Sequence, residues 1–179
     1  MLLAFCFFVA APQTFTLDAG KSVMRYHIVH KLHQVDAEAH SSEGRALLQP
    51  DGAGQVMVRT AVSAFNSGDR NRDEHMLEVT EAGKFPNVVL KGTFSAPSTK
   101  SFPAKVNVVL SGELEFHGQK KPISVPLELT WNSADEAHTV GQVTVSLDAY
   151  GVERPALLFV KIEDGCRIDI DLTWNREHH

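Results

Sequence analysis

Apolar and polar residues alternate along most of the chain from Phe15 onwards, and this period of two constrains the fold more than any other feature. In residues 104–116 every second side chain is apolar or small, and the alternation resumes after Gly118 and continues to Trp131. Side chains two positions apart on a strand share a face, so these runs predict strands with one apolar and one polar face. Such strands are typical of antiparallel sheets.

Turn-forming residues separate these runs at short intervals. They are Pro50-Asp51-Gly52, His117-Gly118-Gln119, Asn132–Asp135 and Glu163-Asp164-Gly165. About eight strands joined by short connections predict an all-β sandwich or a closed barrel. The sequence contains no repeat, no low-complexity tract and no linker, so residues 12–176 are expected to form one domain.

The first eleven residues differ from the rest of the chain. Leu2 to Ala11 are all apolar, a length typical of the central part of a signal peptide and too short to span a bilayer. No Lys or Arg precedes them, and the alternative is a buried first strand. We expect residues 1–11 to be a signal peptide and the protein to be periplasmic or otherwise exported. Removal of the peptide leaves Cys166 as the single thiol. A lone cysteine in a strand is usually a small buried apolar residue, and we expect this of Cys166.

Composition narrows the range of partners. The net charge is −5, whereas non-specific nucleic-acid binding requires a basic face, so no nucleic-acid partner is expected. No run of Lys and Arg suggests binding to an anionic membrane, and no stable membrane insertion of the mature chain is expected. A homodimer is left open.

One charged segment, residues 70–86, interrupts the alternation and predicts a short helix. Asn71 can cap this helix with Glu74 in capping-box position, and Gly83 can end it. Arg72 and His75 share a helical face whereas Asp73 points elsewhere, so the three do not form a catalytic triad. So short and polar a helix is expected to lie across the end of a sheet and cover an opening. We predict no catalytic residue and no enzymatic activity.

Four histidines, His27, His30, His33 and His40, fall within fourteen positions of the first strands. On a strand His27 and His30 face opposite sides, and neither an HxH pair nor a cysteine ligand accompanies them, unlike most zinc sites. We therefore predict no metal and no cofactor. A metal or redox accessory that uses the His27–His40 cluster remains an alternative function.

The inner face of a closed barrel is the largest candidate site. Barrels of about eight strands are either filled by side chains or hold one small ligand. An apolar cavity with few polar groups suits an extended hydrocarbon ligand. Periodicity alone leaves a fully packed core open, so an envelope stress or interaction protein without a ligand is a second alternative.

Four motifs in order resemble the YceI-like family. That family has a strand with a histidine near its end, an RDxHL helix, a YP or FP step and a GxLxxxGxxKP hairpin. The matching residues are Tyr26–His30, Arg72–Met76, Lys84–Pro86 and Ser111–Pro122. Their order and spacing match over roughly residues 14 to 174. Two departures are the segment 77–83, which is shorter than in the family and lacks aromatic residues, and the polar strand around Asp36 and Glu38.

The resemblance implies an eight-stranded antiparallel lipocalin-like barrel with one short helix covering an end, commonly exported to the bacterial periplasm. Some members hold a polyisoprenoid-type lipid, and no enzymatic activity is established for the family. It implies binding or transport of an apolar chain lipid, with His30, Arg72 and His75 at the cavity mouth. The residues expected to line the ligand are Tyr26, Ile28, Val58, Val62, Val88, Leu90, Val108, Leu110, Leu114, Val125 and Leu127.

Overall fold

A computed structural model describes residues 11–30, 33–97, 99–154, 156–157 and 160–178, with only the backbone given for residues 30, 33, 156, 157 and 160. The predicted signal peptide therefore lies almost wholly outside the described residues. The strands are β1 (Gln13–Leu17), β2 (Val23–His30), β3 (His33–Ala39), β4 (Glu43–Leu48), β5 (Ala53–Ala61), β6 (Asn87–Ser95), β7 (Ala104–Phe116), β8 (Gln119–Trp131), β9 (Glu136–Ser146), β10 (Ala156–Leu157), β11 (Val160–Lys161) and β12 (Gly165–Arg176). The helices are α1 (Arg70–Val79) and three 3-10 turns, Ala19–Lys21, Val62–Ala64 and Asp148–Tyr150.

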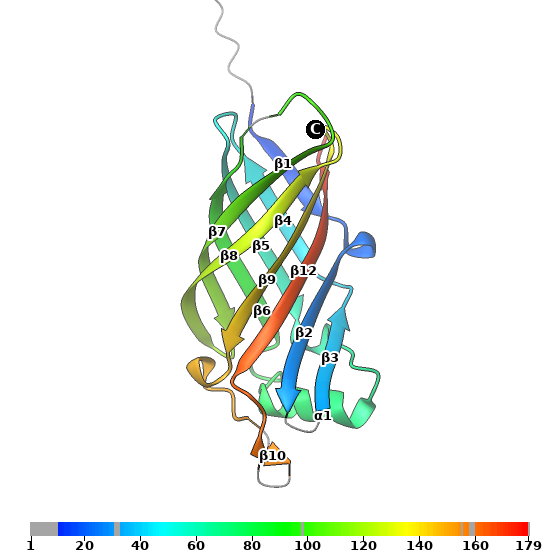
Figure 1. Cartoon of the computed structure of the whole chain (residues 1–179), viewed down its shortest axis with the longest axis vertical. Coiled ribbons are helices and arrows are strands. Elements are labelled where there is room, and N and C mark those ends of the chain that lie inside the picture. The colour runs from blue at the N-terminus through cyan, green and yellow to red at the C-terminus, as the bar shows by residue number, and fades with distance from the viewer. Residues whose placement is uncertain (1–10, 31–32, 98, 155, 158–159, 179) are drawn as a thin grey trace, which may run out of the picture.

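Antiparallel strands close into a barrel (Figure 1). The long strand β12 closes it, because its C-terminal part pairs with β1 and its middle part pairs with β2. Strands β1 and β2 thus share one position around the barrel, and β3 and β4 share another, which gives eight positions. The predicted eight-stranded antiparallel lipocalin-like barrel with one short helix is confirmed.

The β7–β8 hairpin shows how local sequence sets the register. Phe116 pairs with Gln119, which leaves His117 and Gly118 as a two-residue turn. Both have positive φ angles, 50° and 69°, as the tightest hairpin turns require. A side chain at Gly118 would collide with the ring of Phe85, so the FP step and this hairpin fit together only with glycine.

Helix α1, the one α-helix among the described residues, lies across one end of the barrel, below β2 and β3 in Figure 1. Its cap differs from the expectation: the Asp69 side chain accepts a hydrogen bond from the Arg72 amide, at 3.1 Å, in place of Asn71. The helix ends at Val79, before Gly83, and Glu81 just beyond it has a positive φ of 46°, which is not helical. The Thr80 hydroxyl donates to the Met76 carbonyl at 2.7 Å. No helix in the described part of the chain is long and apolar enough to cross a membrane.

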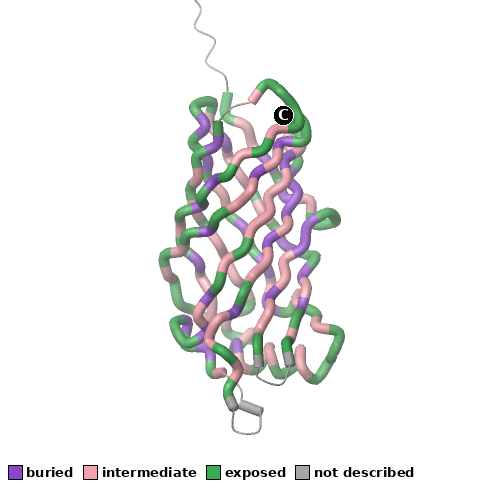
Figure 2. Tube along the Cα trace, in the orientation of Figure 1, coloured by how far each residue is buried: buried purple, intermediate pink, exposed green. Residues whose placement is uncertain are grey.

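Burial follows the alternation along the strands (Figure 2). On β8, Val125 and Leu129 are buried, whereas Ser124 and Pro126 between and beside them are exposed. The inward residues form two apolar clusters. One gathers around Phe15, Trp131 and Trp174, and the other lies at the α1 end. The outward residues are mostly polar, and a few are exposed apolar residues such as Val109, which is 56% exposed. The strand faces predicted to be apolar point into the barrel, and the faces predicted to be polar point outward.

Candidate functional site: an apolar cavity inside the barrel

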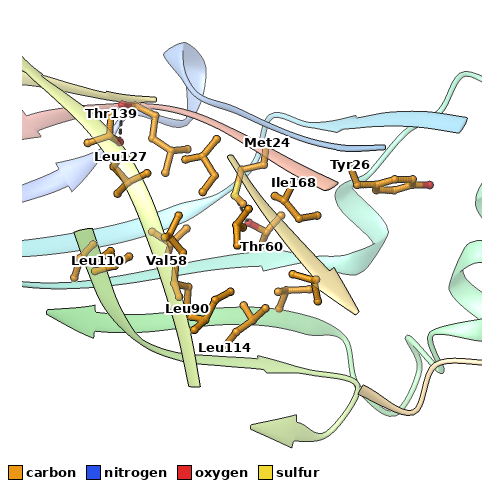
Figure 3. Close-up of a pocket in the computed structure, with 18 of the residues that line it drawn as sticks. Met24, Tyr26, Val58, Thr60, Leu90, Leu110, Leu114, Leu127, Thr139 and Ile168 are labelled. Carbon is orange, nitrogen blue, oxygen red and sulfur yellow. Dashed lines mark hydrogen bonds between the residues drawn. The ribbon is translucent and has the colours of Figure 1, made fainter. Parts of the chain in front are cut away.

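A cavity of about 200 Å³ runs through the inside of the barrel. Its wall comes from β1, β2, β4 to β9 and β12 and is almost entirely apolar (Figure 3). It reaches from Trp131 and Trp174 at one end to Phe65, Met76 and Thr80 at the other, where α1 lies. One water molecule needs about 10–15 Å³ of such space, so the cavity has room for about a dozen water-sized or methylene-sized groups.

The wall residues themselves show that the interior is not filled by side chains. Leu90, Ile123 and Leu127 point inward on central strands, yet each keeps part of its surface accessible. In a core packed at the usual density, large aliphatic residues at the middle of closed strands would be fully buried. Their remaining accessible surface faces the cavity, so a guest molecule could remove it from water.

The eleven residues predicted to line the ligand all lie on this wall. Their contact with a ligand stays a prediction. Sequence reasoning left out several wall residues that obey the same alternation, among them Ile168, Ile170 and Leu172 on β12. It also left out Phe65 and Met76, which lie outside the strands and have no periodic signal.

The end of the cavity farthest from α1 is closed by aromatic rings. Phe15 and Trp131 pack with ring centroids 5.5 Å apart, and Trp174 completes this floor. The Trp174 indole donates a hydrogen bond to the Thr139 hydroxyl at 3.0 Å. The Trp131 indole nitrogen is buried and has no hydrogen-bond partner in the described structure. These two residues are the only tryptophans of the chain, so both report on the cavity.

At the opposite end, Met76 of α1 and Thr80, which follows the helix, contact the cavity. Arg72, predicted to lie at the mouth, is not a wall residue. Its guanidinium donates to the Ser67 hydroxyl at 2.9 Å and to the Ser67 carbonyl at 3.1 Å. Asp73 accepts from the same hydroxyl at 2.6 Å, so the Arg-Asp pair ties the helix start to the preceding loop.

Of the other two residues predicted at the mouth, His75 is not a wall residue and the side chain of His30 is not described. His75 is exposed, and its ring nitrogen Nδ1 lies 3.5 Å from Glu78 Oε2 on the outer side of the helix. On a helix, residues one position apart point in different directions, and Met76 takes the cavity face. His30 ends β2, and its side chain lies outside the described part.

Two titratable side chains in the wall are kept neutral by their surroundings. Burial raises the pKa of Tyr26 to about 12, with the Asp73 carboxylate raising it further and the Arg72 guanidinium opposing. Burial also raises the pKa of the Cys166 thiol to about 12. A buried thiol that stays protonated is a poor nucleophile. The wall can therefore hold an apolar molecule but offers no ionised group to it.

The histidines of the first strands lie on the outside of the barrel where the structure describes them. His27 lies between two carboxylates, with Nδ1 2.6 Å from Asp36 and Nε2 2.7 Å from Asp169. His40 lies 3.2 Å from Glu38. The side chains of His30 and His33 fall outside the described part. Among described residues, no three His, Cys, Asp or Glu side chains are arranged to hold a metal ion.

Solved structures with the same fold include three bacterial proteins. A polyisoprenoid binding domain from Saccharophagus degradans, implicated in plant cell wall breakdown, superimposes with a TM-score of 0.74 at 17% identity, covering 91% of this chain and 98% of its own. BcnA from Burkholderia cenocepacia gives 0.72 at 17% identity, covering 88% and 98%. The YceI protein of Campylobacter jejuni gives 0.63 at 13% identity, covering 84% and 90%. At sequence identities of 13–17%, these superpositions show that the chain shares the fold of the three proteins and nothing more.

Sequence comparison also identifies relatives. A UPF0312 protein of Pseudomonas fluorescens is 31% identical over 71 residues, which is 40% of this chain and 36% of the relative, so the alignment spans about a third of that protein. The family model of the YceI-like domain matches residues 15–174, which include every strand of the barrel except the first two residues of β1 and the last two of β12. The chain therefore belongs to the family of YceI-like domain proteins.

Proposed function

We propose that the protein binds one apolar chain lipid of polyisoprenoid type inside the barrel, without catalysing a reaction. The observation that carries this proposal is the cavity, whose wall is apolar along its whole length and in which Leu90, Ile123 and Leu127 keep accessible surface. A relative with the same fold is described as a polyisoprenoid binding domain. A flexible branched hydrocarbon suits a narrow, elongated apolar space better than a rigid or polar molecule does.

The size of the cavity sets the expected strength of binding. A chain of about a dozen methylene-sized groups gains about 0.8 kcal/mol for each group removed from water, roughly 10 kcal/mol in total before costs. Loss of motion on association opposes this by several kcal/mol. The balance corresponds to affinities in or near the micromolar range. A longer polyisoprenoid requires wall side chains to move to other rotamers or part of the chain to remain outside.

We further propose that the protein carries this lipid in the periplasm or another exported location. The apolar residues 2–11 support export, because their length is typical of a signal peptide. A hydrocarbon chain needs shelter to cross an aqueous compartment, and the barrel provides such a shelter. Cell fractionation, with determination of the N-terminus of the mature protein, tests this part of the proposal. A protein that stays in the cytoplasm with its first residues intact would contradict it.

Mass spectrometry of an organic extract tests the binding proposal. The protein is purified without detergent and extracted, and the extract is compared with that of the Leu127→Phe variant, in which the added ring occupies the cavity. We expect the wild-type extract to contain one class of apolar chain lipid and the variant extract to contain much less. An extract free of lipid, together with no uptake by the delipidated protein, would contradict the proposal.

A further inference from the structure

The hydroxyl of Tyr26 is a polar group of the cavity wall that no other described residue satisfies. Tyr26 is only 7% exposed, and its ring packs on Phe65 with centroids 5.4 Å apart. Its hydroxyl points away from the other labelled wall residues (Figure 3). No hydrogen bond joins this hydroxyl to a residue in the described part of the chain. In the described structure the fully buried polar side-chain atoms without a partner are His117 Nε2 and Trp131 Nε1, so the Tyr26 hydroxyl keeps accessible surface from which it can donate to a ligand.

The remaining polar groups of the wall do not compete for this role. The threonine hydroxyls are hydrogen-bonded inside the protein: Thr60 with Ser42, Thr80 with the Met76 carbonyl, and Thr139 with Trp174. The Trp131 indole nitrogen has no partner, but it is sealed from the cavity by its own surroundings and has essentially no accessible surface. Apart from the Cys166 thiol, which is only a weak donor, Tyr26 is therefore the one wall residue described with a donor that a guest molecule can reach.

The position of Tyr26 along the barrel fixes which part of a ligand it can meet. On β2 it pairs with Ile168 of β12, close to the α1 end. Trp131 ends β8 and Trp174 is the third residue from the end of β12, and both lie at the opposite end of the barrel. A lipid with its chain directed towards the two tryptophans would place its polar end beside Tyr26. The start of α1 is near, because the charges of Asp73 and Arg72 act on the Tyr26 hydroxyl.

The charges of the segment that carries α1 disfavour an anionic ligand. Between Asp69 and Lys84 the chain carries five carboxylates and three basic residues. Each basic residue is already engaged: Arg70 with Glu74 at 2.8 Å, Lys84 with Glu81 at 3.6 Å, and Arg72 with Ser67. A phosphate placed here would lose its hydration without gaining a cation from these residues, and the surplus carboxylates would repel it.

We propose that Tyr26 donates a hydrogen bond to an uncharged oxygen of the bound lipid, an alcohol or a carbonyl, and that the α1 end rejects phosphorylated lipids. This inference rests on the proposed function and narrows its ligand class. Tyr26 is then a residue that determines specificity, since it recognises the polar end while the apolar wall holds the chain.

Chain-matched ligands test the inference. Delipidated protein is loaded with the apolar fluorophore N-phenyl-1-naphthylamine, which is displaced by farnesene, farnesol or farnesyl phosphate. Farnesol should bind more tightly than farnesene, and farnesyl phosphate at least about tenfold more weakly than farnesol. Tyr26→Phe should weaken farnesol about fivefold, as expected for one hydrogen bond of about 1 kcal/mol, and leave farnesene unchanged. Tyr150→Phe is the matched control, because Tyr150 is the only other tyrosine and its hydroxyl donates to the Leu114 carbonyl outside the cavity.

Each outcome separates the inference from the function on which it rests. If neither farnesene nor farnesol displaces the fluorophore, both the proposed function and the inference are wrong. Suppose that both ligands bind and that the Tyr26→Phe variant, whose melting temperature is unchanged, binds farnesol as tightly as the wild type. The lipid-binding function then stands and the role of Tyr26 is refuted. Tight binding of farnesyl phosphate that is lost in Arg72→Gln would assign the polar end to Arg72 instead.

Discussion

Replacing Leu127 with phenylalanine should stabilise the empty protein and abolish lipid binding. Leu127 points into the cavity from the middle of β8 and keeps accessible surface there. Phenylalanine adds three carbon atoms to the side chain. If they enter empty apolar space, burial at about 0.8 kcal/mol for each methylene-sized group contributes up to about 2 kcal/mol. If the interior were already packed, the same atoms would cost about 1–3 kcal/mol. The sign of the change therefore distinguishes a cavity from a filled core.

Chemical denaturation and ligand displacement on the same delipidated samples measure the two effects. The variant should unfold at a higher urea concentration than the wild type. It should also lose almost all binding of N-phenyl-1-naphthylamine. Val109→Phe is the matched control, because Val109 faces outward on the neighbouring strand and is 56% exposed. It should change neither quantity appreciably. A Leu127→Phe variant that loses stability by 1 kcal/mol or more would refute the reasoning, since it would show that no space exists beside Leu127.

Three further variants test the fold. Asp69→Ala should lower the unfolding free energy by about 1 kcal/mol, because it removes the helix cap. Asn71→Ala should lower it by almost nothing. If thermal melts show the larger loss for Asn71→Ala, the assigned cap is wrong. Gly112→Ala should destabilise the barrel severely, because its Cβ would lie 2.0 Å from the Lys91 carbonyl oxygen of β6, and a melting temperature equal to that of Ser111→Ala would be incompatible with this close strand approach.

Asp169→Asn tests the outer charge network: burial raises the pKa of Asp169, but hydrogen bonds from Gln142 and His27 outweigh it and hold the pKa below its ordinary value. A lowered folded-state pKa gives stability that is present above the unfolded pKa of about 4 and lost as pH falls through the folded value. The variant should therefore cost about 1 kcal/mol at pH 7 and almost nothing near pH 2, whereas an equal cost at both pH values would exclude this role.

The strands and the cavity wall were predictable from the sequence because each strand has one face towards the interior and one towards water. That constraint selects alternate residues directly, and positions such as Val125 and Leu110 follow from it. Whether the interior is filled did not follow, because a filled barrel and a hollow one require the same alternation. The difference depends on how far the inward side chains reach across the barrel. The alternation of apolar and polar residues carries no information about that distance.

The helix and its charged residues were harder to place. Asp69, Asn71 and Asp73 are all acceptable caps by residue type, and the helix uses Asp69, which follows Gly68 with its φ of 78°. Arg72 was predicted to lie at the cavity mouth, yet it and Asp73 both bind Ser67, which precedes them by five and six positions in the loop before the helix. Contacts of this kind have no periodic signal.

Tryptophan fluorescence offers the most direct measurement of the central claim that the barrel holds one apolar chain. The only two tryptophans, Trp131 and Trp174, line the cavity floor. Delipidated protein is titrated with dodecanol that carries a bromine at its terminal carbon, a contact quencher, with unbrominated dodecanol as the control. The account predicts saturable quenching at one chain for each protein, absent in Leu127→Phe. Quenching that does not saturate, or none beyond that of the control, would contradict it.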